Sequence, residues 1–147
     1  MTGAIRPILA NSCARAATAE EARFRIDRPI GARSAVVVAL DDEAADVVDR
    51  VAEKPWRGAR FVRAGNDTVD LEDVDVVVMI ATADTDADVA ARLADAAFAR
   101  GIMTAGLIVG ESSDVAATVS ALRPHARNLM VTADEGDVAE VLTALRA

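Results

Sequence analysis

Five short apolar runs, separated by segments of helical spacing or by turns, are the feature that most constrains the fold of this chain. Several of these runs are continuous stretches of Val, Ile, Leu and Ala, as buried parallel strands are. They occupy residues 35–40, 59–63, 75–81, 103–109 and 128–132. Strands that alternate with helices favour a parallel sheet covered by helices on both faces. The pattern therefore predicts a three-layer α/β fold built on a doubly wound, mostly parallel five-stranded sheet.

Four further segments have the spacing of amphipathic helices. They are residues 44–51, 86–100, 113–122 and 135–145. In the first of them, apolar residues recur at positions i, i+3, i+4 and i+7 from Ala44. Pro55 ends this helix, and Gly101 ends the second, because glycine is common just past a helix end.

The first 34 residues differ from the rest in pattern and in charge. Pro7 and Pro29 interrupt regular structure, although residues 18–24 have the capping-box spacing of a short helix. Six arginines face three carboxylates in this segment, whereas the whole chain has a net charge of −8. We therefore divide the chain into an irregular basic arm, residues 1–34, and an acidic Rossmann-like domain, residues 35–147. The arm is interpreted as lying along the acidic body of its own or a neighbouring chain, with an anionic ligand as the alternative.

Composition excludes several classes of protein. An acidic body argues against nucleic acid as a partner, because Lys and Arg that neutralise phosphates dominate such binding. The single cysteine, Cys13, permits no intramolecular disulfide, which suits a reducing compartment. No apolar run approaches the ~18 residues of a membrane span, and the N-terminus lacks the apolar region of a secretory signal. We expect a soluble cytoplasmic protein without a membrane partner.

A ligand site is expected at the carboxyl ends of the strands, where the strand order reverses. The candidate residues for this crevice are Asp41, Asp42, Asn66, Thr82, Asp84, Thr85 and Ser112. A phosphate site would need glycines whose backbone N–H groups approach the ligand. The first turn instead reads A-L-D-D-E, and the turn after the central strand reads A-T-A-D-T-D-A-D. Carboxylates in both turns would repel a phosphate.

The acids of these turns allow two interpretations. Four of them could converge on Mg²⁺, since hard cations prefer carboxylate oxygens. These four are Asp41, Asp42, Asp84 and Asp86. Alternatively, Asp and Thr at helix starts accept hydrogen bonds from free N–H groups and complement the helix dipole. We favour capping, which the spacings Thr85–Asp88 and Asp134–Asp137 repeat at other helix starts.

Nucleophilic catalysis has little support in the sequence. His125, the only histidine, lies in a connection before the last strand, away from the crevice that a Ser-His-Asp arrangement would need. Cys13 has no neighbouring base, so we interpret it as inert. Ser112 and Ser113 precede a helix, where serines usually serve as caps.

Several segments resemble a known family. They are AVVVALDDEAADVVDRV, WRGARFVRAGNDT, DVDVVVMIATADTDADVAARLADAAFARGIMTAGLIV and ALRPHARNLMVTADEGDVAEVL. Over residues 35–145 they are similar in order and pattern to the GTP-binding domain of the FtsZ/tubulin family, with residues 66–68 in place of that family's Asn-Thr-Asp turn. The family's G-G-x-G turn is here residues 39–42, and its G-G-G-T-G-T-G loop is residues 83–88, both without glycine. The resemblance thus implies a nucleotide-binding fold, and the departures argue against GTP hydrolysis and filament assembly.

Two weaker resemblances give alternatives. Residues 36–43 look like the start of a response-regulator receiver, whose paired acids hold magnesium. Residues 79–81 stand where the receiver's phosphoacceptor Asp would be, and residues 132–134 lack its Lys, which leaves a pseudo-receiver. The segment 75–101 resembles sugar isomerase (SIS) domains, whose Ser/Thr-rich loop binds sugar phosphates.

The leading hypothesis is a non-catalytic or regulatory FtsZ-like domain that acts through protein contacts, as a homo-oligomer or accessory subunit. The first alternative is a Mg²⁺-dependent enzyme or pseudo-receiver that uses the acidic crevice. The second is a sugar-phosphate sensor built on Thr82, Thr85, Ser112 and Ser113.

Overall fold

The structure is a computed structural model that describes residues 31–65, 68–83 and 85–147. Residues Gly31–Ala147 form one compact unit. The short helix predicted at 18–24 lies outside the described residues, as do Asn66, Asp84 and the first thirty residues of the predicted arm. Residues 31–34 join the compact unit: the Arg33 N–H donates to the Arg146 carbonyl at 2.8 Å.

A single parallel sheet forms the centre of the fold, as the sequence predicts. Its strands are β1 (Ala35–Ala39), β2 (Ala59–Arg63), β3 (Val76–Ala81), β4 (Met103–Val109) and β5 (Asn128–Thr132). They lie in the order β2-β1-β3-β4-β5, and each neighbouring pair is parallel. The helices are α2 (Asp42–Ala52), α3 (Ala87–Ala99), α4 (Ala116–Leu122) and α5 (Gly136–Ala144). The α/β prediction is confirmed, with every pair in this sheet parallel.

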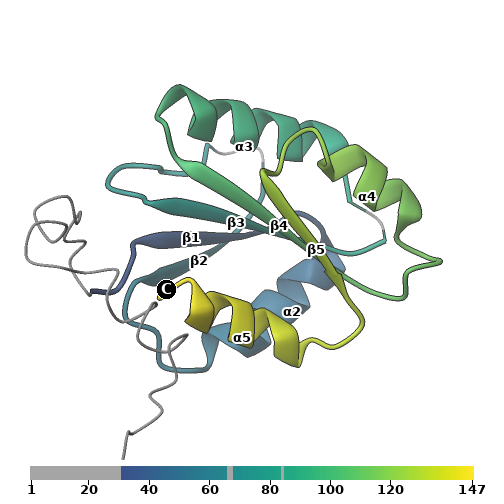
Figure 1. The fold of residues 1–147 in the computed structure, drawn as a ribbon, viewed down its shortest axis with the longest axis horizontal. Helices are drawn as coiled ribbons and strands as arrows, with labels where there is room; N and C mark the ends of the chain where they lie inside the picture. The colour runs from purple at the N-terminus through teal and green to yellow at the C-terminus, as the bar shows by residue number, and fades with distance from the viewer. Residues whose placement is uncertain (1–30, 66–67, 84) are drawn as a thin grey trace, which may run out of the picture. The chain divides into compact units, whose positions relative to one another are not determined.

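Two apolar layers hold the helices against the sheet. Alternate side chains of each strand point to opposite faces, so the buried strands β1 and β3 supply both layers. One layer packs against α2 and α5, and the other against α3, α4 and the segment 69–74. Figure 1 shows α3 and α4 on one side of the sheet and α2 and α5 on the other. Most of the core consists of Val and Ala, whose small volume lets the helices lie close to the sheet.

The helix ends follow the predicted signals, with two adjustments. Gly101 follows the C-cap Arg100 of α3 with φ +67°, the left-handed conformation that glycine adopts without strain. The N-cap of α3 is Asp86, whose carboxylate accepts from the Asp88 N–H at 2.9 Å, so Thr85 is not the cap. Helix α4 begins three residues later than the predicted Ser113, because a turn with a hydrogen bond from the Asp114 N–H to the Glu111 carbonyl (2.9 Å) precedes it.

The β2 edge of the sheet carries charged side chains and lies beside the only tryptophan. Arg60 donates to the Asp70 carbonyl and Arg63 to the Asp49 carboxylate, each at 2.5 Å. The Trp56 Nε1–H donates to the Val51 carbonyl at 2.8 Å, at the end of α2. The Trp56 ring lies 6.0 Å from that of Phe61, measured between centroids.

The β5 edge carries no charged side chain within the strand. Leu129 lies over Gly106 of β4, so closely that a Cβ added at Gly106 would stand 2.7 Å from Leu129 Cδ1 and 3.2 Å from Ala126 Cβ. Met130 and Val131 of this strand are exposed. In the described residues, no helix combines the length and apolar character that a membrane span requires.

Candidate functional site

The strand order reverses between β1 and β3, and the candidate site lies at their carboxyl ends. The chain leaves β1 towards β2 on one side and leaves β3 towards β4 on the other. Such a switch point is where ligands bind in open α/β sheets, because the two connections diverge there and leave a crevice. The loop after β1 brings Asp41 to this point, and the loop after β3 brings Thr82 and Thr85.

The carboxylate of Asp41 accepts four hydrogen bonds at the switch point. Its Oδ1 accepts from the Ala44 N–H at 2.7 Å and from Thr82 Oγ1 at 2.7 Å. Its Oδ2 accepts from the Thr82 N–H at 2.8 Å and from Thr85 Oγ1 at 2.5 Å. One side chain thus caps α2 and joins the loops after β1 and β3. We call this group, with Thr118 below, the switch-point network.

The hydrogen bonds determine the protonation of Asp41. Burial alone would raise the pKa of this carboxyl, because it disfavours the charged form. The hydrogen bonds from Thr85, Ala44 and Thr82 favour the carboxylate, and together they outweigh burial, so the pKa is lowered. Asp41 is therefore ionised at neutral pH, with its charge held by donors from its own chain.

Thr118 extends the network to α4. Its hydroxyl is buried and lies 2.9 Å from the Thr82 carbonyl and 3.2 Å from the Ala83 carbonyl. Sequence reasoning missed this residue. The available signal was its position between Val115 and Leu122 on the buried face of α4, where an apolar residue would ordinarily stand.

Three other predicted site residues, Asp42, Asp86 and Ser112, make no hydrogen bond to the network. Asp42 is exposed in the first turn of α2, and Asp86 is exposed at the start of α3, where it caps the helix. Ser112 is exposed in the turn after β4, and the expectation that Ser112 or Ser113 caps the next helix is wrong: the N-cap of α4 is Val115, without a side-chain cap. Among the described residues, no group of three or more His, Cys, Asp or Glu side chains is arranged to hold a metal ion. The capping interpretation is confirmed for Asp41 and Asp86.

At the carboxyl end of β5, the polar side chains are likewise hydrogen-bonded to groups of their own loop. The Asp134 carboxylate accepts from the Gly136 N–H at 2.8 Å, at the start of α5. The Thr132 hydroxyl donates to the Asp137 carboxylate and accepts from the Asp134 N–H at 3.0 Å. Acidic and threonine side chains at these strand ends thus satisfy donors of their own loops.

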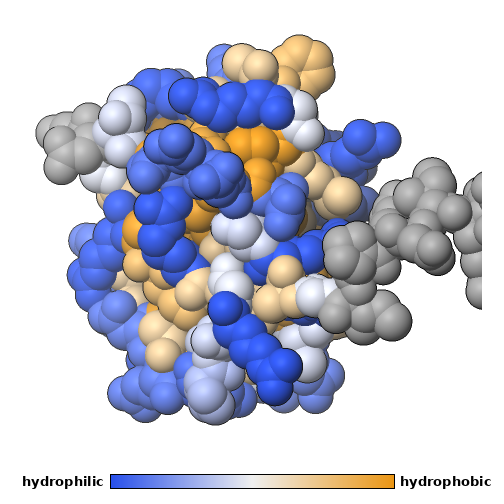
Figure 2. Space-filling model, turned by 90° about the vertical axis from the view of Figure 1, so that its left-hand side faces the viewer, coloured by the Kyte–Doolittle hydropathy of each residue, from blue (hydrophilic) through white to orange (hydrophobic). Residues whose placement is uncertain are grey.

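Two of the cavities beside the sheet lie against α3, and neither is lined by the switch-point network. One of about 200 Å³ lies between the end of β2 and α3, and its walls are largely apolar, with Val38, Val69 and Leu93 among them. The other, of about 620 Å³, is an open hollow near the start of β4, lined by residues of α3 and of the α4–β5 connection. Figure 2 shows hydrophobic surface in the upper part of the side at which β4 begins, between hydrophilic residues.

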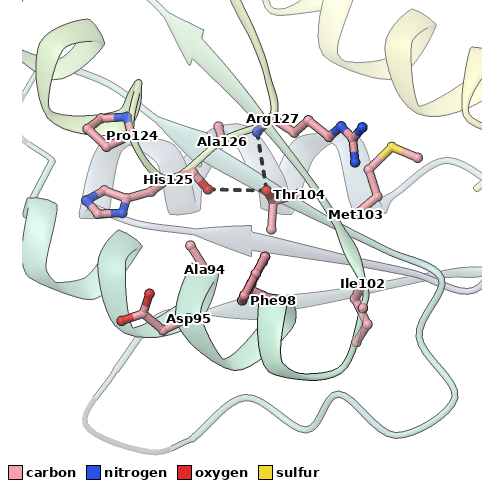
Figure 3. A pocket seen from close by; sticks show the side chains of 11 residues that line it. Ala94, Asp95, Phe98, Ile102, Met103, Thr104, Pro124, His125, Ala126 and Arg127 are labelled. Atoms are coloured by element: carbon pink, nitrogen blue, oxygen red, sulfur yellow. Dashed lines mark hydrogen bonds between the residues drawn. The ribbon is translucent and has the colours of Figure 1, made fainter.

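His125 lies at the larger hollow, away from the switch point, as the sequence predicts. Figure 3 shows it on the connection that also carries Pro124 and Arg127. The Thr104 hydroxyl donates to the His125 carbonyl at 3.2 Å and accepts from the Arg127 N–H at 3.3 Å (Figure 3). The backbone of His125 therefore anchors the connection to β4.

Comparison with known proteins gives no relative for this chain: no family model matches it, and no curated protein matches its sequence.

Proposed function

We propose that this chain is a non-catalytic or regulatory α/β domain, a relative of the FtsZ-type nucleotide-binding fold, which acts through contacts with other protein surfaces. The observation that supports the proposal is the Asp41 carboxylate at the switch point, with its four hydrogen bonds from Ala44, Thr82 and Thr85. A nucleotide phosphate in this position would need free backbone N–H donors. Here the Ala44 and Thr82 N–H groups already donate to a negatively charged side chain.

Electrostatics favour the same proposal. A phosphate placed at the start of α2 would meet the Asp41 carboxylate, with Asp42 in the next position. Like charges at close range in a partly buried site oppose binding by several kcal/mol. An arrangement that disfavours phosphate at the switch point supports a domain that acts through its outer surface.

A magnesium site at the same position requires Asp41 to exchange hydrogen bonds for metal coordination. Each hydrogen bond to a charged group contributes about 2 kcal/mol, so this exchange is costly. Asp42 and Asp86 are both exposed, and each carries the charge that suits a helix N-terminus. The cap at Asp86 and the place of Asp42 in the first turn of α2 account for these two acids without a metal.

The test is a thermal-shift series on the full chain with GTP, GDP, a sugar phosphate and Mg²⁺, singly and combined. A ligand present at 100 times its Kd would stabilise the folded state by about 2.7 kcal/mol, which such a series resolves. We expect no shift with any of these ligands and no release of phosphate from GTP.

Two outcomes would contradict the proposal. Stabilisation by a nucleotide or sugar phosphate, or hydrolysis of GTP, would mean that the switch point binds phosphate. Stabilisation by Mg²⁺ that is lost in Asp42→Asn would establish the metal site instead. Asp46→Asn is the matched control, because Asp46 is also exposed on α2 but lies a turn away from the switch point.

A further inference from the structure

The outer edge of β5 presents an uncharged strand with exposed apolar side chains. Met130 is 46% exposed and Val131 is 38% exposed, and the strand reads N-L-M-V-T. Exposed edge strands pair readily with another strand, since their outer N–H and C=O groups lack a partner in the sheet. Proteins usually protect such an edge with Lys, Pro or a bulge, and the sequence of β5 has neither charge nor proline.

The opposite edge, β2, has this protection. Arg60 and Arg63 are exposed on that strand, and each donates to an oxygen of its own chain. A strand approaching β2 would have to desolvate two guanidinium groups. A partner of the sheet is therefore expected at β5 and not at β2.

The backbone of β5 is oriented for pairing at residues 129 and 131. The Thr132 carbonyl accepts from the Gly110 N–H at 2.8 Å, so it points towards β4. Successive residues of a strand point their backbone groups to opposite sides, which directs those of Leu129 and Val131 to the outer edge. In an antiparallel pair centred on Met130, Leu129 of one strand would exchange hydrogen bonds with Val131 of the other.

We propose that β5 pairs antiparallel with β5 of a second copy of this chain, across a two-fold axis at Met130. The pairing joins the two sheets into one of ten strands and makes an isologous contact, in which the same residues serve on both sides. Met130 faces Met130 of the second copy at the axis. The inference rests on the proposed function, since it names the partner that a domain acting through protein contacts would bind.

Charges at the two ends of β5 favour a second copy over an unrelated strand. Arg127 directly precedes the strand and Asp134 follows it, whereas the Glu135 carboxylate is already paired with Arg50 of its own chain at 2.6 Å. An antiparallel arrangement brings Arg127 of each copy to the acidic end of the other, where opposite charges attract. None of the ion pairs between described residues involves Arg127.

The experiment is sedimentation velocity of the full chain over a wide range of concentration. We expect a reversible monomer–dimer equilibrium. Met130→Lys should weaken dimerisation by at least ~100-fold, because it places two like charges face to face at the axis. Circular dichroism would verify that the variant is folded, as expected for a side chain already half exposed.

Two further variants make the test specific. Arg127→Glu should weaken the dimer, because it sets a carboxylate against the acidic end of β5 in the second copy. Phe98→Lys is the matched control: Phe98 is 87% exposed on α3, outside β5, and its substitution should leave the dimer unchanged.

A chain that stays monomeric at every concentration would overturn the inference, and so would a dimer that survives Met130→Lys but is lost in Phe98→Lys. Neither result bears on ligand binding at the switch point. The proposed function fails only in the thermal-shift series, so the two failures are distinguishable.

Discussion

The switch point and the β5 edge differ in how far the chain pairs its own polar groups and buries its own apolar side chains. At the switch point, the Asp41 carboxylate, the Thr82 N–H and the Thr118 hydroxyl all have hydrogen-bond partners in the chain. At the β5 edge, apolar side chains remain exposed, and none of the strands in the described part of the chain lies on the outer side of β5. In this fold ligands ordinarily bind at the strand ends. Here the polar groups at the switch point are already hydrogen-bonded to one another, whereas the β5 edge exposes apolar side chains.

The difference indicates at which of the two places a partner would gain more free energy on binding. A ligand at the switch point must first replace hydrogen bonds that already exist, and each replacement returns little net free energy. A strand at the β5 edge would add hydrogen bonds to backbone groups that have no partner among the described strands, and it would bury apolar side chains as well. We expect perturbation of the switch point to affect folding and perturbation of the edge to affect association.

The largest expected effect is that of Asp41→Ala on folding. The substitution removes the N-cap of α2 and leaves the Ala44 and Thr82 N–H groups without their acceptor, which should lower the free energy of unfolding by about 3 kcal/mol. Urea denaturation followed by circular dichroism measures this loss. Asp42→Ala is the matched control, and we expect it to change stability by less than about 0.5 kcal/mol. Equal losses in the two variants would contradict a special role for Asp41.

A smaller effect is expected from Gly106→Ala beneath the β5 edge. The added Cβ meets Leu129 Cδ1 and Ala126 Cβ, so β5 must shift slightly, at a cost of about 1 kcal/mol. The cost is at the low end of overpacking because the end of the Leu129 side chain can move.

Combination with Leu129→Val measures whether this contact is the cause. If Leu129 limits the space at Gly106, the double variant loses less stability than the sum of the two single variants. If the two losses of stability in urea denaturation are strictly additive, positions 106 and 129 do not interact. The cost of Gly106→Ala would then come from a shift of the β5 backbone and not from the Leu129 side chain.

The smallest expected effect is the pH dependence contributed by Asp41. Because the pKa of its carboxyl is lower in the folded chain than in the unfolded chain, its contribution is fully present above the unfolded pKa, about 3.9. The contribution is lost as the pH falls through the lower, folded pKa. The stability difference between the native chain and Asp41→Asn should therefore be constant from neutral pH to about pH 5 and shrink in stronger acid. A difference that grows on acidification would contradict the lowered pKa.

The fold was accessible from the sequence because its signals are local and consistent. The run V-V-V-M-I-A within β3 is apolar on both faces, which only a central strand of a covered sheet accommodates. Gly101 marked the end of α3, and the acid at position 41 marked the start of α2. A buried strand and a helix end each depend on residues that are close together in the sequence, so the sequence pattern predicts them.

The arrangement of the candidate site was only partly accessible. The carboxyl ends of β1 and β3 were expected to meet, which brought Asp41, Thr82 and Thr85 together. The choice between a metal ligand and a cap depended on which donors surround Asp41, and these come from segments about 40 residues apart in the chain. Thr118 was missed for the same reason, since its partners lie 36 and 35 residues away.

The position of Trp56 has a practical consequence for all of these experiments. The chain has one tryptophan and no tyrosine, and the indole lies beside β2, with three strands between it and β5. Its fluorescence therefore reports the environment of α2, of the β2 edge and of the cavity that Trp56 shares with α5. The emission should change when the chain unfolds and remain constant when two copies join at β5. A single chromophore thus separates the folding transition from assembly without any label.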